Sequence, residues 1–145
     1  MLPDENSKRF IAVLNKKIEI GRLMNALGHI TAGLSGGSSK TEEMCFLQYQ
    51  DKDGGAHPNI SHFPFIVLKA DNSNKIRTVR NECIARGIPF SDFTSTMTVG
   101  TSQEQQYNTW TTPEILKATP YTRNMQATFN LGLIKVVQIS RLNKL

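Results

Sequence analysis

The stretch that decides the fold is Arg9-Phe-Ile-Ala-Val-Leu-Asn15 together with Gly21-Arg-Leu-Met-Asn-Ala-Leu-Gly-His-Ile-Thr-Ala-Gly-Leu34. The first segment is an apolar run that predicts a strand, and the second has the spacing of an amphipathic helix. At about 100° per residue, the apolar side chains of this helix fall in one narrow stripe that we expect to pack on a sheet. The stripe consists of Leu23, Leu27, Ile30 and Leu34.

A polar arc lies beside this stripe and is the first candidate for a functional surface. Arg22, Asn25 and His29 fall on it, next to Ala26. Histidine takes up and releases a proton near neutral pH, so His29 is a candidate general base, and Asn25, one turn earlier, is placed to orient it or a ligand. The alternative is a structural histidine that ties the helix to a neighbouring loop.

Further apolar runs and turn signals extend this unit into a sheet. The run at 64–69 is continuously apolar up to Lys69, as in strands buried on both faces of a sheet. The segment 51–55 is rich in turn formers and releases the chain into an expected loop at 56–63. Strands are expected at 9–15, 44–49, 64–69, 88–93 and 130–139.

A second helix, at 75–86, stands between two of these strands. A strand, helix and strand in succession form a crossover unit, for which parallel pairing is the default. The polar segment 98–123 is expected to be mostly loop, with a short helix starting near Thr112 and Pro113 at its first position. The chain is therefore predicted to be α/β, with residues 1–145 forming a single three-layer α/β/α domain around a mixed sheet of about five strands.

Composition places few limits on function. A chain of 145 residues, 39% hydrophobic, can bury a sizeable core as one domain. The net charge of +5 and pI near 9.4 suit a nucleic-acid partner, but the basic residues are scattered, which favours a solvated surface. The N-terminus does not resemble a signal peptide and no apolar segment has the length of a membrane span, so we expect a cytoplasmic protein without a membrane partner.

Metal, disulfide and cofactor motifs are not recognised in the sequence. Cys45 and Cys83 lie in apolar surroundings without a CxxC partner, and we expect buried free thiols. His57 and His62 flank a proline-containing loop and lack the paired spacing of zinc ligands, so no metal site is predicted. The paired glycines of the chain are read as turns and not as phosphate-binding loops, and no cofactor is expected.

The order of elements over residues 9–139 resembles the type II peptidyl-tRNA hydrolase fold, and more closely an uncharacterised family within that superfamily. The motifs that carry the resemblance are Gly21, Asn25-x-x-x-His29-x-x-x-Gly33-Leu34, Phe65-Ile-Val-Leu-Lys-Ala70 and Asp92-Phe-Thr-x-x-Met97. The resemblance implies a homo-oligomer, most simply a homodimer.

The catalytic pattern of the hydrolases does not carry over to this chain. Those enzymes place a lysine, a glutamine and a histidine on the first helix, where a gapless comparison finds Met24, Gly28 and Thr31. A shift of two residues matches His29 and sets Arg22 against the lysine, but Ala26 then stands in place of the glutamine and Ser95 in place of the aspartate. These replacements predict little or no peptidyl-tRNA hydrolase activity.

Two classes of function remain open. In one, the chain is a non-catalytic ligand-binding or interaction module, whose partner is a small molecule or RNA. In the other, it is a small hydrolase that uses His29 and Asp92, at the end of a strand, on a tRNA-linked or nucleotide-like substrate. Candidate ligand-binding residues are Arg22, Asn25, Thr94 and Trp110, the last as the anchor of a lid formed by residues 98–123.

Overall fold

Strand β1 (Lys8–Asn15) and helix α1 (Ile20–Gly37) form where the sequence predicts them. The structure is a computed structural model that describes residues 1–37, 41–112 and 130–138. Helix α1 buries Leu23, Ala26, Ile30 and Leu34. The stripe is thus shifted by a fraction of a turn from the expected one: Ala26 is fully buried and Leu27 is only half-buried at its margin. The helix also includes the paired glycines Gly36 and Gly37, which were expected to form a turn.

The main sheet has β1 near its centre and contains both parallel and antiparallel pairs, as expected for a mixed sheet. β1 pairs in parallel with β4 and antiparallel with β6, which in turn pairs antiparallel with β5. The two strands of the expected crossover, β4 and β5, run in the same direction but do not pair with each other, because β1 and β6 lie between them. The strand order is β4 (Phe65–Ala70), β1, β6 (Asn130–Gln138) and β5 (Phe90–Thr94).

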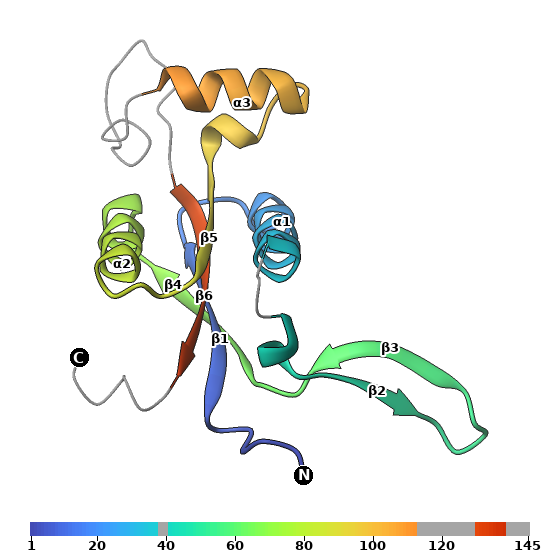
Figure 1. Ribbon diagram of the computed structural model, residues 1–145. Helices are drawn as coiled ribbons and strands as arrows, with labels where there is room; N and C mark the ends of the chain where they lie inside the picture. The colour runs from blue at the N-terminus through green and yellow to red at the C-terminus, as the bar shows by residue number, and fades with distance from the viewer. Residues whose placement is uncertain (38–40, 113–129, 139–145) are drawn as a thin grey trace.

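Helices α1 and α2 (Ser73–Ala85) cover opposite faces of this sheet (Figure 1). On the α1 face, Phe10 and Ala12 pack with the buried residues of α1 and with Phe93. On the α2 face, the alternating residues Ile11 and Val13 pack with α2. The α2 side of the core is completed by Ala70, Ile76 and Cys83.

Helix α2 begins at Ser73, two residues before the expected start, and the Asn72 side chain caps it by accepting a hydrogen bond from the Lys75 backbone N–H at 3.0 Å. Cys83 is buried as expected and Ile76 is also buried, whereas Ile84 is 55% exposed. The other thiol, Cys45, is half-buried and has a positive φ of 48°, so only one of the two cysteines has the expected buried position.

The expected second strand forms a separate two-stranded hairpin and does not join the main sheet. Strand β2 (Phe46–Gln50) follows a short 3₁₀ helix, η1 (Thr41–Met44), and pairs with β3 (Ala56–Ser61). The loop expected at 56–63 is therefore wrong for most of its length. Pro58, which suggested a loop, is accommodated because β3 pairs with β2 alone among the described strands and this pairing changes register nearby. The hairpin projects away from the helices and the sheet (Figure 1).

The polar region after β5 contains a helix where a loop was expected. A short 3₁₀ helix, η2 (Ser95–Met97), leads to α3 (Ser102–Thr111). The side chains of Thr101 and Glu104 form a capping box at the start of α3, a local signal that the sequence analysis missed. The helix expected from Pro113 onward lies outside the described residues. In the described part of the chain, no helix has the length and apolarity that crossing a membrane requires.

Candidate functional site

The polar arc of α1 is exposed, as the helical spacing predicts. Arg22, Asn25 and His29 all face solvent. The ring of His29 stacks on that of Phe93 in β5, with centroids 5.4 Å apart and planes inclined by 16°. Phe93 is 6% exposed, so the imidazole covers part of the core on the α1 face. This contact gives His29 a packing role, as the structural alternative expects, but its partner lies in a strand and not in a loop.

Asp92 lies on the other face of the sheet. Its Oδ2 accepts a hydrogen bond from Nε of Arg80 on α2 at 3.0 Å, and each side chain is 24% exposed. The Arg80 guanidinium also lies 5.8 Å from the ring centroid of Phe90. The carboxylate is therefore held in an ion pair between α2 and β5.

The structure separates the two proposed catalytic residues because neighbouring strand residues point to opposite faces. Phe93 carries the His29 contact on the α1 face, so its neighbour Asp92 points to the α2 face, where Arg80 holds it. The sheet stands between the two polar groups. His29 and Asp92 therefore contact different partners, Phe93 and Arg80.

The other two predicted site residues, Thr94 and Trp110, have contacts of their own. Thr94 is buried, and its hydroxyl lies 2.7 Å from that of Thr96, which lies 2.8 Å from that of Thr109 on α3. This chain of hydroxyls ties β5 to α3. Trp110 is 81% exposed, and its ring centroid is 6.4 Å from that of Tyr107 on the same helix. It therefore does not anchor a lid on the core, and much of the expected lid, 113–129, lies outside the described residues.

Two further features of the structure are relevant to ligand binding. A hollow of about 490 Å³ beside α3 is lined by residues such as Val99, Gln103 and Tyr107, and none of the predicted site residues lines it. No group of three metal-binding side chains gathers within the residues that the structure covers. His57 lies 3.9 Å from Asp51 within the hairpin, whereas His62 Nε2 lies 2.9 Å from the carbonyl oxygen of Pro3.

The carboxyl ends of the parallel strands β1 and β4 carry a compact polar cluster. The buried Asn15 amide donates to Ser73 Oγ at 3.1 Å, which joins β1 to the start of α2. The Asp71 carboxylate pairs with Lys16 at 2.7 Å and also with Lys75. Hydrogen bonds from Lys16 and then Lys75 lower the pKa of Asp71 to about 2. The groups of this cluster bind one another and connect β1, β4 and α2.

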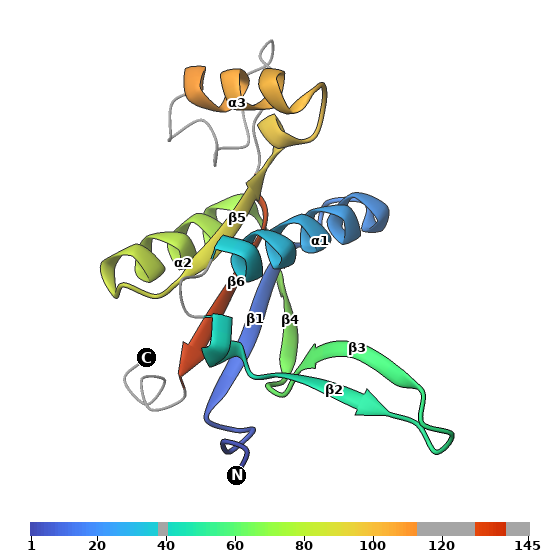
Figure 2. The same ribbon diagram turned by 45° about the vertical axis from the view of Figure 1, so that its right-hand side comes forward.

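The free edge of β4 is the feature that the sequence analysis missed. β4 was expected to be buried on both faces, but it is the terminal strand of the sheet, as Figure 2 shows beside β1. Phe65 and Val67 are 43% and 49% exposed, and Leu68 is 48% exposed. A continuous apolar run has the same composition in a central strand and in an edge strand, so only the tertiary structure distinguishes them.

The direction of the backbone groups of β4 follows from its pairing with β1. The carbonyl oxygen of Pro64 accepts a hydrogen bond from Phe10 N at 2.9 Å, and that of Ala70 accepts one from Lys16 N at 3.0 Å. Even-numbered residues of β4 therefore face β1. Since residues of a strand in a parallel ladder direct their N–H and C=O groups alternately to the two edges, the odd-numbered residues face outward.

The outward-facing residues of β4 are Phe65, Val67 and Lys69. In the described part of the chain, no strand pairs with this edge. Phe65 stacks on Phe10 with centroids 5.8 Å apart, which places the side chains of all three outward-facing residues on the α1 face. Leu68 points to the α2 face, so the strand exposes apolar side chains on both sides of its free edge.

The fold and this site together define an α/β domain with helices on both faces of a mixed sheet and an apolar strand at one edge, whose outer side has no strand beside it among the described residues. Residues 8–119 match the family described as "Protein of unknown function (DUF2000)", and the chain belongs to this family.

One solved structure is similar over nearly the whole chain: the protein of unknown function Atu0240 from Agrobacterium tumefaciens strain C58. It superposes with a TM-score of 0.71 at 16% identity, covering 95% of this chain and 92% of that one, which shows a shared fold. No curated protein matches the chain. None of these comparisons links the chain to the peptidyl-tRNA hydrolases.

Proposed function

We propose that the protein is a non-catalytic protein-interaction module whose contact element is the free edge of β4. The observation that supports this most is the set of three outward-facing residues in an apolar strand with no strand beside it in the described chain. Natural proteins protect such edges with charges, prolines, bulges or covering elements, whereas the only charge on β4 is Lys69 near its end. An edge of this kind binds an extended segment of another polypeptide by strand addition.

The arrangement of the polar residues supports a binding role over the hydrolase alternative. That alternative needs His29 and Asp92 at one substrate, and the two side chains lie on opposite faces of the sheet. Each is also engaged, with Phe93 and Arg80 respectively. The homo-oligomer implied by the resemblance is one assembly that strand addition at β4 produces.

Selection of extended peptides from a random display library, with the full chain as bait, tests the proposed function. We expect selected peptides to bind at β4 and to lose at least 10-fold in affinity in the Val67→Pro variant. Proline removes the outward N–H of Val67, and the ladder with β1 does not use that group. Val67→Thr, which keeps the N–H and suits a strand, should retain the affinity.

A matched control comes from α2. Ile84 is an apolar residue with similar exposure, 55% against 49% for Val67, and it lies on a helix instead of the strand edge. Ile84→Lys should leave peptide affinity unchanged. Equal loss in the Val67 and Ile84 variants, or full affinity in Val67→Pro once its native circular dichroism is established, would show that β4 is not the contact element.

A further inference from the structure

We infer, resting on the proposed function, that the strand that pairs with β4 is β4 of a second copy of this chain. The two strands run antiparallel and are related by a two-fold axis that passes beside Val67. The two four-stranded sheets then form one continuous sheet, with the α1 helices of both copies on the same face. This inference follows from the outward-facing backbone groups, from the side chains beside them and from the apolar residues that flank the edge.

The backbone groups of the edge are arranged symmetrically about Val67. The outward set contains Phe65, Val67 and Lys69, so a two-fold axis at its middle residue brings every outward residue opposite another outward residue. In an antiparallel ladder, two opposed outward residues exchange both of their N–H···O=C bonds. The pairs are Val67 with the partner's Val67, Phe65 with the partner's Lys69, and Lys69 with the partner's Phe65. All the outward groups of the three residues are then satisfied.

A parallel arrangement of two β4 strands does not satisfy these groups with two-fold symmetry. In a parallel ladder, an outward residue of one strand bonds to the residues on either side of its opposite number. Each outward residue must therefore lie opposite an inward-facing residue of the other strand, so two identical strands have to be shifted by one residue relative to each other. A two-fold axis places each residue opposite its own copy and does not allow this shift. Closed dimers are the commonest symmetric assemblies, and of the two strand directions only the antiparallel one closes here.

The side chains favour the same register. Val67 meets the partner's Val67 on the α1 face, and the two β-branched side chains form an apolar cross-strand pair. Each Lys69 lies opposite the partner's Phe65, whose ring its aliphatic stem can cover while the ammonium group reaches water. Each chain carries a net charge of +5, and this register keeps the two Lys69 ammonium groups apart instead of opposing them.

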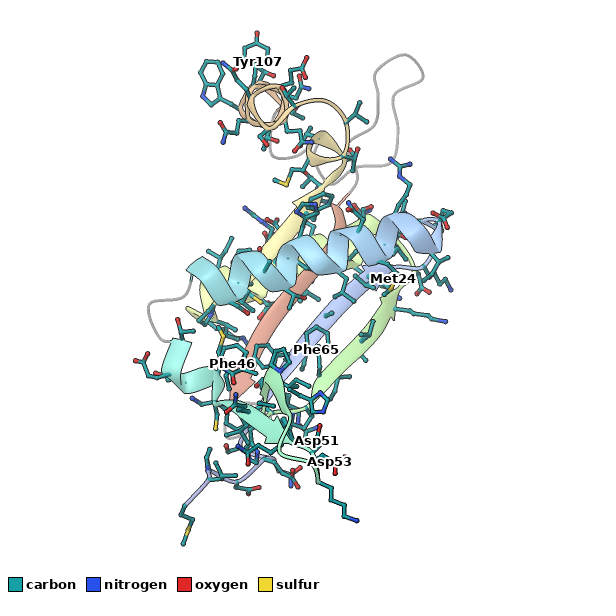
Figure 3. All side chains as sticks on the ribbon, turned by 90° about the vertical axis from the view of Figure 1, so that its right-hand side faces the viewer. Met24, Phe46, Asp51, Asp53, Phe65 and Tyr107 are labelled. Atoms are coloured by element: carbon teal, nitrogen blue, oxygen red, sulfur yellow. The ribbon has the colours of Figure 1, made fainter. Side chains whose placement is uncertain are left out.

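Apolar residues beside the edge extend the contact beyond the strands. In the view of Figure 3, Met24 of α1 lies toward the same end of the sheet as the carboxyl end of β4, and Phe46, at the base of the hairpin, lies toward the same end as Phe65 at the start of β4. Met24 is 57% and Phe46 is 39% exposed. Antiparallel pairing brings the carboxyl end of one β4 to the start of the other, and so brings Met24 toward the partner's Phe46. Stable interfaces bury about 1,200–2,000 Å² in total, so these flanking residues are needed in addition to the strand edge.

The mass of the full chain in solution is the first test. Sedimentation equilibrium over a range of concentrations should give twice the chain mass of 16.2 kDa. Val67→Arg places two guanidinium groups opposite each other at the axis and should weaken dimerisation at least 100-fold. Val67→Thr and Ile84→Lys should leave the dimer intact. Circular dichroism must show native folding in each variant. A wild-type monomer at all concentrations, or an unaffected dimer in the folded Val67→Arg variant, overturns the inference.

Disulfide trapping tests the register without relying on a disruptive variant. Opposed residues of a hydrogen-bonded antiparallel pair have Cα atoms about 5.5 Å apart, within the disulfide range of about 4.4–6.8 Å. In a Cys45→Ser background and a glutathione redox buffer, Val67→Cys alone should form a covalent dimer. Phe65→Cys and Lys69→Cys should cross-link efficiently only when the two variants are mixed. Cross-linking of Phe65→Cys with itself in preference to that mixture contradicts the register.

The outcomes separate this inference from the proposed function. If the wild-type chain is monomeric but selected peptides bind at β4, the second-copy inference fails and the interaction module remains. If the chain dimerises through β4 with the expected cross-links, both are supported. If it is monomeric and no selected peptide depends on Val67, both fail.

Discussion

The imidazole of His29 lies against Phe93, with ring centroids 5.4 Å apart. Its place on α1 makes it conspicuous in the sequence, but an exposed ring that covers a buried aromatic residue has a packing role. Asp92, one residue before Phe93, is held by Arg80 on the opposite face. The sequence indicates the residue types but does not show the phase of β5, which determines the face to which each side chain points.

His29→Ala should lower the free energy of unfolding by about 0.5–1.5 kcal/mol, because an aromatic pair contributes about that much beyond the area it buries. His29→Phe, which keeps a planar ring, should recover most of this loss. Asn25→Ala, on the same exposed arc, serves as the control and should change stability little. Chemical denaturation measures all three variants. Equal stability of His29→Ala and the wild type would contradict the packing role.

The ion pairs of Asp71 make the stability of the fold depend on pH in the acid range. Hydrogen bonds from Lys16 and Lys75 lower its pKa from 3.8 to about 2 in the folded protein. A carboxyl group whose pKa is lower in the folded protein than in the unfolded chain stabilises the fold at pH values above its unfolded pKa. For Asp71 this stabilisation is lost as the pH falls from about 4 to about 2. NMR titration of the Asp71 carboxyl should give a midpoint near pH 2, and Lys16→Met should raise it. An ordinary midpoint in the wild type contradicts the ion pairs.

At the scale of elements, apolar periodicity predicts β1, α1, α2 and β5 well because burial and helical or strand spacing act together in them. The hairpin and the edge position of β4 were not predicted, for different reasons. β3 contains Pro58, a residue typical of loops, although a strand with a single neighbour accommodates it. β4 has the composition of a central strand, and its position depends on which strands pair, which local sequence does not determine.

The burial of α1 has a direct consequence for stability. Ile30 is 1% exposed in the centre of the α1 face, whereas Leu27 is half-buried at its margin. Ile30→Ala should cost about 2–5 kcal/mol of unfolding free energy because it leaves a cavity in the core. Leu27→Ala should cost clearly less, since the site is partly open to solvent. A larger loss for Leu27→Ala, measured by urea denaturation, would show that α1 is rotated relative to the sheet.

At the scale of the whole molecule, the fold supplies a packed core on both faces of the sheet and an apolar strand edge that the described chain leaves uncovered. The similar solved structure shares this architecture, and both that protein and the family are described as being of unknown function. Two observations support the proposed role as an interaction module: His29 and Asp92 lie on opposite faces of the sheet, and the outward-facing backbone groups of β4 have no strand beside them in the described chain.

The separation of His29 from Asp92 predicts that the chain does not hydrolyse peptidyl-tRNA. The catalytic pattern of those enzymes is incomplete in either alignment of α1, and His29 has no carboxylate from Asp92 on its side of the sheet. Release of peptide from a peptidyl-tRNA substrate should stay at the uncatalysed rate. A genuine hydrolase under identical conditions is the positive control. Comparable turnover by this chain would refute the non-catalytic assignment.

Amide hydrogen exchange along β4, followed by NMR on the full wild-type chain, tests the central claim most directly. The amides of Ile66 and Leu68 face β1 and should exchange slowly at every concentration. The outward amides of Phe65, Val67 and Lys69 should be equally slow at high protein concentration and should become fast on dilution, because their protection comes from a second strand. Outward amides that exchange quickly at all concentrations contradict the claim that this edge pairs with a second copy of the chain.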